Sequence, residues 1–322
     1  MTMTLVLTTP RFVQNGPAMG MMCMAVAMLL LPVGDTFAKL LTSHLAAVEV
    51  TTARLMAQAL VLLPTALVMR HRLRGPMFSA IVALSGGLVM VTLTSLIWAF
   101  SVMPIATAIA IFFAEPLILT MLVGPLLGEH VGPRRTIAVG VGLAGVVLVV
   151  RPGGDLGWAA LLPLIAATAY ALNMIVLRRA SGVRSGLTVQ CGATLYACLG
   201  MVILCSTFAV NGWYQPGFAA LPAWGWGAIA ASGAFAAVSF ILIAEAFRRA
   251  EAGLLAPFQY LEIIGATVAG FFVFGDLPDH LTWAGITIIL ASGLYVFWRE
   301  QMPSNRANIL PGRRRARRIR SR

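Results

Sequence analysis

Ten apolar segments, each long enough to cross a lipid bilayer, occupy most of the 322-residue sequence. A transmembrane helix needs about 20 residues to span a hydrocarbon core of about 30 Å. Short connections rich in Pro, Gly and Arg separate the segments, and no soluble insertion interrupts them. The sequence therefore predicts an all-α integral membrane protein with ten transmembrane helices. They cover residues 17–40, 47–69, 77–101, 104–124, 133–150, 157–177, 187–210, 222–247, 253–275 and 281–299.

The composition agrees with a protein that lies in a membrane. Hydrophobic residues make up 59% of the chain and charged residues 11%, whereas a soluble globular domain carries about 25% charged residues. The first apolar segment is longer than the core of a typical signal peptide, and no clean A-x-A cleavage site follows it, so we predict a retained helix. Because the sequence has no Walker-type GxxxxGK[ST] stretch, we expect no ATP hydrolysis.

The two halves of the sequence repeat the same plan at a constant offset of 147 residues. Each half places one glutamate inside an apolar segment, Glu115 in the first half and Glu262 in the second. We predict two five-helix repeats, residues 17–150 and 157–299, with the working site at their interface. The other pairs that match at this offset are Phe100 with Phe247, Thr120 with Thr267, Gly128 with Gly275 and Glu129 with Asp276.

The distribution of positive charge predicts the orientation of the chain. When the ten helices are followed from the N-terminus, 20 of the 23 Lys and Arg residues fall on one side of the membrane, and the positive-inside rule makes this side cytoplasmic. Both the N-terminal segment, residues 1–16, and the basic tail, residues 300–322, are then cytoplasmic. Because each repeat has an odd number of helices, we expect the second repeat to be inverted relative to the first, as in transporters that work by alternating access.

The net charge of +12 and the Arg-rich run at residues 313–320 raise the alternative of nucleic-acid binding. Directly after ten membrane spans, such a tail is better explained by contact with anionic lipid headgroups, to which each Arg contributes about 1 kcal/mol. We therefore expect the lipid bilayer, and no nucleic acid, as a partner of this chain. Small residues at 138–145 indicate close packing of helices within the chain or at the interface of a homodimer.

Three charged residues stand within the first two apolar segments. Asp35 and Lys39 are four residues apart and share one helix face, and Arg54 enters from the same side of the membrane to a similar depth. Charged groups at the centre of a membrane helix cost about 2.5–3.5 kcal/mol and usually face a partner or a cavity. One interpretation is a structural ion pair that ties the two helices. The other is a site in the transport path, where two cations facing one acid attract an anionic group of the substrate.

Glu115 and Glu262 are the leading candidates for a substrate-binding or coupling site. No cation stands within one helical turn of either residue in the sequence, so each must find a partner on another helix, become protonated or bind a ligand. Proton coupling is therefore one of the expected modes. Pro116 and Pro257 free backbone carbonyls near the two acids. Other side chains that offer polar or aromatic contacts are Trp98, Tyr170, Asn173, Ser239, Gln259 and Tyr260.

The sequence gives no reason to expect a cofactor or a metal ion. Cys191, Cys198 and Cys205 share one face of the seventh predicted helix, but no His or acid accompanies them, so packing explains them better than metal binding. The four histidines are scattered in or near the predicted loops, which argues against an integral-membrane enzyme.

The stretch FAEPLILTMLVGPLLGEHVGPRR and the residues GLAGVVLVVRP at 142–152 resemble the first-repeat signature of EamA-type members of the drug/metabolite transporter superfamily. The run at 34–39, followed by Arg54, is similar to the branch that contains bacterial riboflavin and S-adenosylmethionine transporters. The resemblance covers residues 17–299 and implies a central cavity between the two repeats.

We therefore predict a secondary transporter of the bacterial inner membrane that moves a small organic metabolite by alternating access and is not an enzyme. The alternative among transporters is an exporter of amino acids or toxic compounds. The alternatives of another class are an integral-membrane enzyme and a structural partner protein.

Overall fold

The computed structural model describes residues 16–128, 132–151, 157–180, 183–212 and 216–301, and every regular element within them is a helix. The prediction of an all-α fold is confirmed for these residues. The predicted cytoplasmic segment and basic tail lie outside the described residues, apart from Gly16, Glu300 and Gln301. The elements are α1 (Gly16–Leu41), α2 (Ala47–Val68), η1 (Arg70–Arg72), α3 (Ala80–Val102), α4 (Ile105–Phe112), α5 (Glu115–Leu127), α6 (Pro133–Val150), η2 (Gly157–Ala160), α7 (Leu161–Ala180), α8 (Gly186–Val210), η3 (Gly217–Ala220), α9 (Ala223–Arg249), α10 (Ala252–Gln259), α11 (Leu261–Phe274) and α12 (His280–Gln301).

In the described part of the chain, nine helical segments are long and apolar enough to cross a membrane. They follow the order of the first nine predicted spans, and α12 contains a shorter apolar stretch, His280–Val296, at the place of the tenth. The architecture is that of a multi-pass membrane protein.

The fourth predicted span is broken near its middle, which the sequence analysis did not predict. The pattern of residues 104–124 predicts one helix, but α4 ends at Phe112 and α5 begins at Glu115. Pro116 explains the break, because it has no N–H to donate to the carbonyl group of Phe112 and its ring crowds that turn. The amide groups that follow bond to Ala114 instead.

The ninth predicted span is broken in a similar way. Residues 253–275 divide into α10 and α11 at Tyr260, one turn after Pro257. The joint residues of the two spans have almost the same backbone angles, φ −64° and ψ −15° at Ala114 against φ −69° and ψ −12° at Tyr260. The two repeats therefore share a joint directly before Glu115 and Glu262.

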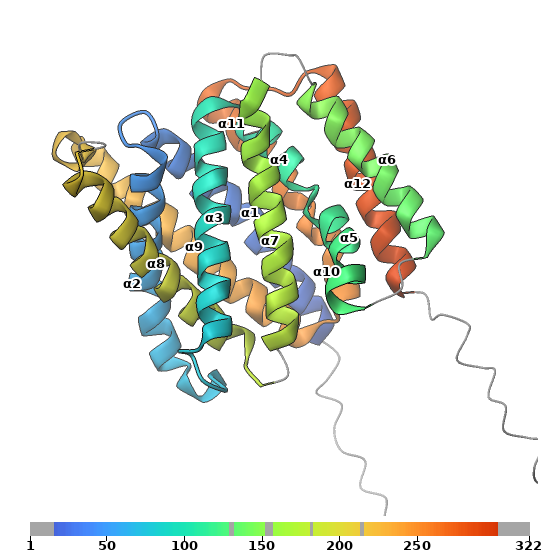
Figure 1. Cartoon of the computed structure of the whole chain (residues 1–322), viewed down its shortest axis with the longest axis horizontal. Helices are drawn as coiled ribbons and strands as arrows, with labels where there is room; N and C mark the ends of the chain where they lie inside the picture. The colour runs from blue at the N-terminus through green and yellow to red at the C-terminus, as the bar shows by residue number, and fades with distance from the viewer. Residues whose placement is uncertain (1–15, 129–131, 152–156, 181–182, 213–215, 302–322) are drawn as a thin grey trace, which may run out of the picture.

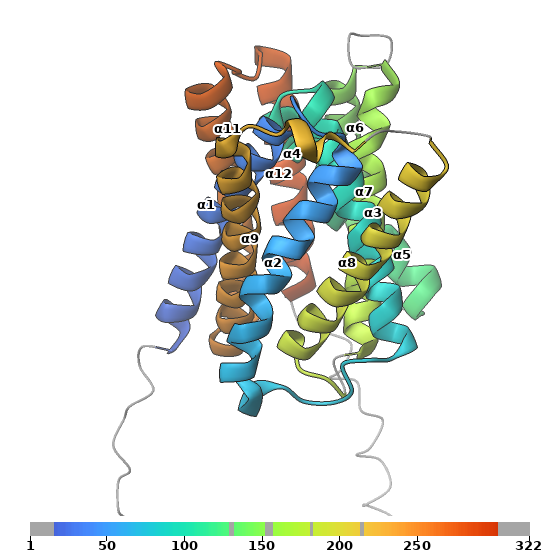
Figure 2. The same cartoon turned by 90° about the vertical axis from the view of Figure 1, so that its left-hand side faces the viewer.

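Contacts between the repeats come in exchangeable pairs. The first repeat contains α1–α6 and the second α7–α12. α1 packs on α9 as α3 packs on α7, and α1 packs on α11 as α5 packs on α7. Equivalent helices also pack on each other: Figure 1 shows α6 beside α12 at one edge, and Figure 2 shows α2 between α9 and α8. Contacts that map onto one another when the two repeats are exchanged are those of an approximate two-fold arrangement.

Matched glycines allow two of these helix pairs to approach closely. Gly86 of α3 and Gly233 of α9 differ by the same 147 residues, and each lies directly against a helix of the other repeat. A methyl group on Gly86 would lie 2.6 Å from the Cβ atom of Tyr196 in α8, and one on Gly233 would overlap Ala57 in α2. Small residues at such crossings are typical of helix packing in lipid.

The serines that precede these glycines add a hydrogen bond at each crossing. Ser85 Oγ donates to Asn173 Oδ1 in α7 at 2.7 Å, and Ser232 Oγ donates to the backbone oxygen of Gly34 in α1 at 2.9 Å. Both bonds join a third helix of one repeat to the first helix of the other. The interface between the repeats is thus fixed by matched small and polar residues.

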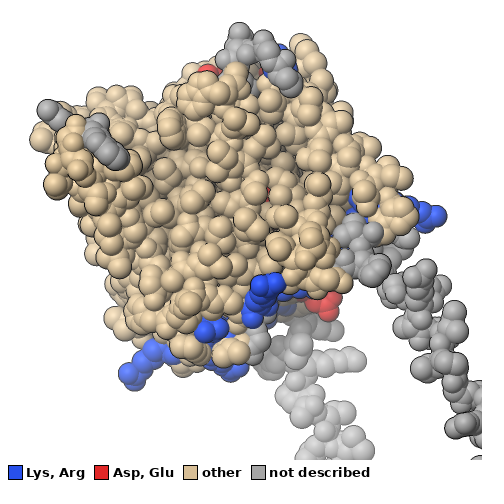
Figure 3. Space-filling model, in the orientation of Figure 1, with Lys and Arg blue, Asp and Glu red and all other residues tan. Residues whose placement is uncertain are grey.

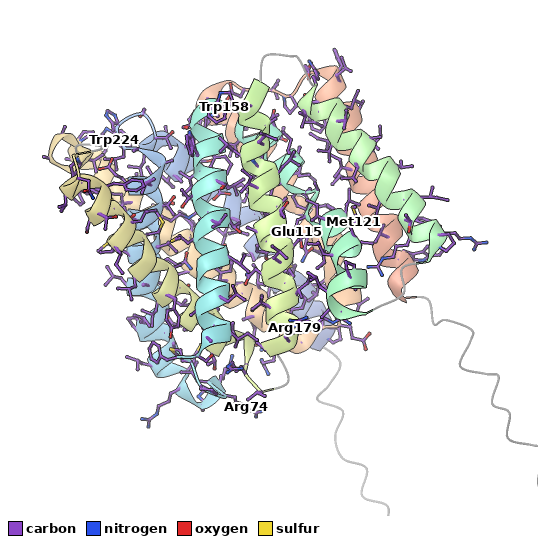
Figure 4. All side chains as sticks on the ribbon, viewed as in Figure 1. Arg74, Glu115, Met121, Trp158, Arg179 and Trp224 are labelled. Carbon is purple, nitrogen blue, oxygen red and sulfur yellow. The ribbon has the colours of Figure 1, made fainter. Side chains whose placement is uncertain are left out.

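The two ends of the bundle differ in charge. Lys and Arg side chains gather along one end, and an almost uncharged surface extends from it on the face shown (Figure 3). We name this the basic end, where Arg74 and Arg179 lie (Figure 4). Trp158 and Trp224 lie at the opposite end, which we name the far end (Figure 4). Arginines and tryptophans at the ends of an apolar bundle are typical of a protein that crosses a bilayer.

Candidate substrate site

Glu115 and Glu262 occupy matching places in the two broken spans. Glu115 is the first residue of α5 and Glu262 is the second residue of α11, directly after the joints at Ala114 and Tyr260. Glu115 lies about halfway between the basic end and the far end (Figure 4). Because the first amide groups of a helix carry partial positive charge, each joint favours an anionic side chain at this place.

Neither carboxylate has a hydrogen bond or an ion pair with another described residue, although both side chains are half-buried inside the bundle. Ionisable groups within a membrane bundle normally pair with each other or face a cavity. No described residue forms an ion pair with Glu115, and Arg54 acts on Glu262 only from beyond ion-pair distance. The two carboxylates are therefore in a position to meet a ligand or a proton.

Two tyrosines interact with the acids and pack against phenylalanines. Tyr170 of α7 interacts electrostatically with both carboxylates, and its ring packs against Phe112 with 5.6 Å between ring centroids. Tyr260 interacts electrostatically with Glu115, and its ring packs against Phe113 at 5.4 Å. Two tyrosine rings thus lie within electrostatic reach of the acids, and two phenylalanine rings pack against these tyrosines.

A buried ion pair lies next to the acid of the second repeat. Arg54 Nη1 of α2 donates to Asp35 Oδ1 of α1 at 2.6 Å, and the two side chains are 4% and 6% exposed. Both members of the pair interact electrostatically with Glu262. The ion pair between the first two helices that the sequence suggested is present, and it belongs to the same buried polar region as the two glutamates.

Lys39 takes no part in that pair. Its Nζ atom lies 3.1 Å from Asp276 Oδ2, 3.2 Å from the backbone oxygen of Met103 and 4.5 Å from the centroid of the Phe274 ring. The expectation that two cations face a single acid is therefore wrong. Asp276, which follows α11 and is remote from Lys39 in sequence, supplies a second acid and balances the charge that was expected to attract an anion.

Other predicted site residues lie outside this group or at its border. Trp98 is 45% exposed and packs edge-on against Trp158, so the structure places it toward the far end and not beside the acids. Gln259 is half-buried at the last position of α10 and has no hydrogen bond among the described residues. Asn173 is engaged by Ser85 in the packing of α3 on α7.

Further buried polar groups inside the bundle lack partners in the described part of the chain. They are Gln58 Oε1, Ser239 Oγ and Arg54 Nε. A buried polar atom without a partner usually indicates a bound water, ion or ligand. Among the described residues, no three His, Cys, Asp or Glu side chains are grouped so that they could hold a metal ion.

Sequence reasoning did not select Phe112 and Phe113 as site residues. Their position directly before Glu115 and the proline-broken joint is the signal in the sequence that points to them. Asp276 matched Glu129 in the repeat, but its role as the partner of Lys39 depends on three-dimensional contact alone.

Comparison with known proteins identifies the family. The sequence profile of the EamA-like transporter family matches residues 18–151 and again residues 157–298. The chain is 25% identical to an S-adenosylmethionine uptake transporter of Rickettsia bellii, over 83% of this chain and 89% of that protein. It is 29% identical to a riboflavin transporter of Rhizobium johnstonii over 61% of this chain, and this match spans 63% of the relative's length.

Two further similarities agree with this result. A riboflavin transporter of Vibrio cholerae is 28% identical over 65% of this chain and 68% of its own length. A crystal structure of another protein superposes with a TM-score of 0.56 over 88% of this chain and 96% of the other, at 17% identity, which is a likeness of fold alone. The two matches of the family profile cover nearly the whole described chain, and the protein belongs to the EamA-like transporter family.

Proposed function

We propose that the protein is a secondary transporter of the bacterial inner membrane that moves a small organic metabolite by alternating access, and that Glu115 and Glu262 form the centre of its substrate site. The observation that carries this proposal is the pair of carboxylates without described partners, one at the joint of each repeat. A buried carboxylate without a partner is unfavourable unless a ligand or proton meets it. A structural role alone gives no reason for two such groups at equivalent places.

The direction of the helices supports two inverted repeats. The first helix of the second repeat, α7, follows Trp158 of η2 at the far end and reaches Arg179 at the basic end (Figure 4). The first helix of the first repeat, α1, starts at the basic end (Figure 2). Inverted repeats can exchange conformations and thereby open the central site to either side of the membrane. We place the basic end, with both termini, in the cytoplasm by the positive-inside rule.

The four aromatic rings support a particular class of substrate. Relatives of this chain are named as transporters of riboflavin and of S-adenosylmethionine, and both compounds carry a fused, nitrogen-containing aromatic ring system. Such rings stack on aromatic side chains with about 1–3 kcal/mol per ring. Their N–H groups can donate hydrogen bonds to a carboxylate. We propose that the substrate is a metabolite with this kind of ring, held between the two glutamates.

Coupling to protons fits the same two groups, because a carboxylate that binds substrate at one stage of the cycle can bind a proton at another. A homodimer that uses the small residues at 138–145 stays a proposal, although these residues and the matching part of α12 pack on each other within the chain. Transport, rather than catalysis, is the activity proposed for the site.

Reconstitution into liposomes tests the proposal. Purified protein should take up radiolabelled riboflavin or S-adenosylmethionine faster than protein-free liposomes, and should release the same compound chemically unchanged. A metabolite whose free concentration is 100 times its dissociation constant should also raise the free energy of unfolding by about 2.7 kcal/mol. A melting curve in detergent records this stabilisation. Uptake of neither compound, without any stabilisation, would contradict the proposed substrate class.

A further inference from the structure

A cavity of about 410 Å³ lies between α5, the first turn of α6 and the end of α7. Most of its lining residues are apolar, and Arg135 and Arg178 add two guanidinium groups to it. The cavity is on the side of the basic end, since Arg178 stands in the last turn of α7 next to Arg179 (Figure 4). Its volume falls within the range of small-molecule sites, which is about 300–1,000 Å³.

The walls of this cavity continue the walls of the candidate site. On α5, Leu119, Val123 and Leu127 line the cavity, and they follow Glu115 at steps of four residues. Residues four apart on a helix form one continuous ridge. The same holds on α7, where Met174 and Arg178 line the cavity and follow Tyr170 at the same step. The cavity lining therefore ends one helical turn from Glu115 on α5 and one turn from Tyr170 on α7.

The equivalent place in the second repeat is filled. At the offset of 147 residues, Leu119, Val123 and Leu127 correspond to Ala266, Gly270 and Phe274 of α11. Ala266 and Gly270 are buried, and α1 packs along this helix. At its end, Lys39 covers the ring of Phe274 and pairs with Asp276. Matching surfaces of the two repeats thus differ: one borders a cavity and the other is covered.

We propose that the cavity is the entrance through which the ring-bearing metabolite passes between the basic end and Glu115, and that Lys39 closes the equivalent entrance at the far end. The inference rests on the proposed function, because it assumes that Glu115 is the destination. The apolar ridges accommodate the flat ring, and the planar guanidinium groups of Arg135 and Arg178 supply hydrogen-bond donors for its polar substituents. In this arrangement the site is open to the basic end.

Thiol labelling tests the entrance without knowledge of the substrate. The four native cysteines are first replaced by serine. Val123→Cys, with Leu119→Cys as a second position on the wall, is then compared with Gly270→Cys. A Cβ atom at Gly270 would lie 3.6 Å from the backbone oxygen of Asp276 and so fits. Met121→Cys serves as a control on the same helix. Met121 does not line the cavity, and its 55% exposed side chain belongs to an apolar span and so faces lipid, which an ionic probe does not enter.

The probe is sulfonatoethyl methanethiosulfonate, which does not cross membranes, applied to one side of oriented vesicles at a time. From the basic end, Val123→Cys should react at least about ten times faster than Gly270→Cys or Met121→Cys. Adding Lys39→Met should raise the reaction of Gly270→Cys from the far end by a similar factor. Labelling needs no transport, so its failure is distinct from a failure of Glu115 and Glu262 variants in uptake assays.

Three results would overturn the inference. The first is slow reaction of both Val123→Cys and Leu119→Cys from the basic end, as slow as that of Met121→Cys. The second is protection of Val123→Cys in membranes that disappears in detergent, since a lipid would then occupy the cavity. The third is fast reaction of Gly270→Cys from the far end while Lys39 is still present.

Discussion

Arg54 of α2 donates a hydrogen bond of 2.6 Å to Asp35 of α1, and both side chains are almost completely buried. Within the membrane this pair joins the first two helices beside Glu262, the acid of the second repeat. The pair is therefore both a structural link and part of the electrostatic surroundings of the candidate site. Its contribution to stability can be measured directly.

Removing one partner of this pair should destabilise the protein strongly. Asp35→Asn leaves the guanidinium group of Arg54 buried without its counter-charge, which typically costs about 3–5 kcal/mol. The double variant Asp35→Asn with Arg54→Met should recover much of that loss, because neither charge remains. Melting temperatures in detergent measure both effects. Equal melting temperatures of the wild type and Asp35→Asn would show that the pair does not hold α1 and α2 together.

The ion pair of Arg151 with Asp279 should stabilise the protein equally at neutral and mildly acidic pH. Hydrogen bonds from Arg151, and then from Thr282, hold the pKa of Asp279 well below its usual range. A carboxyl group with a lowered pKa in the folded state stabilises the protein above its unfolded pKa of about 3.9, and the effect is lost as pH falls through the folded value. The loss in melting temperature caused by Asp279→Asn should therefore be the same at pH 7 and pH 5. A loss that has vanished by pH 5 would contradict this assignment.

Adjacent glycines in α3 provide a direct test of the contact between the repeats. Gly86→Ala should destabilise by about 1–3 kcal/mol, because the added methyl group meets α8 and overpacking of this kind has that typical effect. Gly87→Ala is the matched control, since a Cβ atom there has no neighbour within 4 Å. Chemical or thermal unfolding compares the two variants. Similar effects of both substitutions would mean that α3 and α8 do not approach as closely as described.

Reporter fusions test the predicted orientation. The distribution of Lys and Arg predicts that the loops 151–157 and 211–221 face the periplasm and that both termini face the cytoplasm. A phosphatase reporter fused after Gly154 should be active, and one fused after Pro303 should be inactive. A fluorescent reporter that folds only in the cytoplasm should give the reverse pattern. The same signal from both sites would contradict the ten-span topology.

Much of the fold follows from local properties of the sequence. The length and hydrophobicity of the spans are decided residue by residue, so the all-helical membrane fold could be predicted from them. The repeat could be predicted because Glu115 and Glu262 keep one offset. The joints could not be placed in the same way, because a hydropathy pattern does not distinguish a continuous helix from α4 and α5 separated by two residues.

The site was predictable only in part, because its contacts depend on residues that are distant in the sequence. The interaction of Arg54 with Asp35 joins neighbouring helices and was one of the two sequence interpretations. The pairing of Lys39 with Asp276 joins the first helix to the segment after α11, and no local pattern indicates it. Tyr170 was one candidate among several, and the packing of α7 on α5 is what brings it to the acids.

The most direct test of the central claim is uptake by proteoliposomes that contain Glu115→Gln, Glu262→Gln or both. The amide keeps the shape of the side chain and removes its charge, so folding and insertion should be retained. Glu251→Gln, on an exposed residue before α10, is the matched control. We predict that each site variant lowers the initial rate of riboflavin or S-adenosylmethionine uptake at least about tenfold, a change of about 1.4 kcal/mol in the barrier, while the control stays at the wild-type rate. Wild-type uptake with unchanged pH dependence in the double variant would contradict the account.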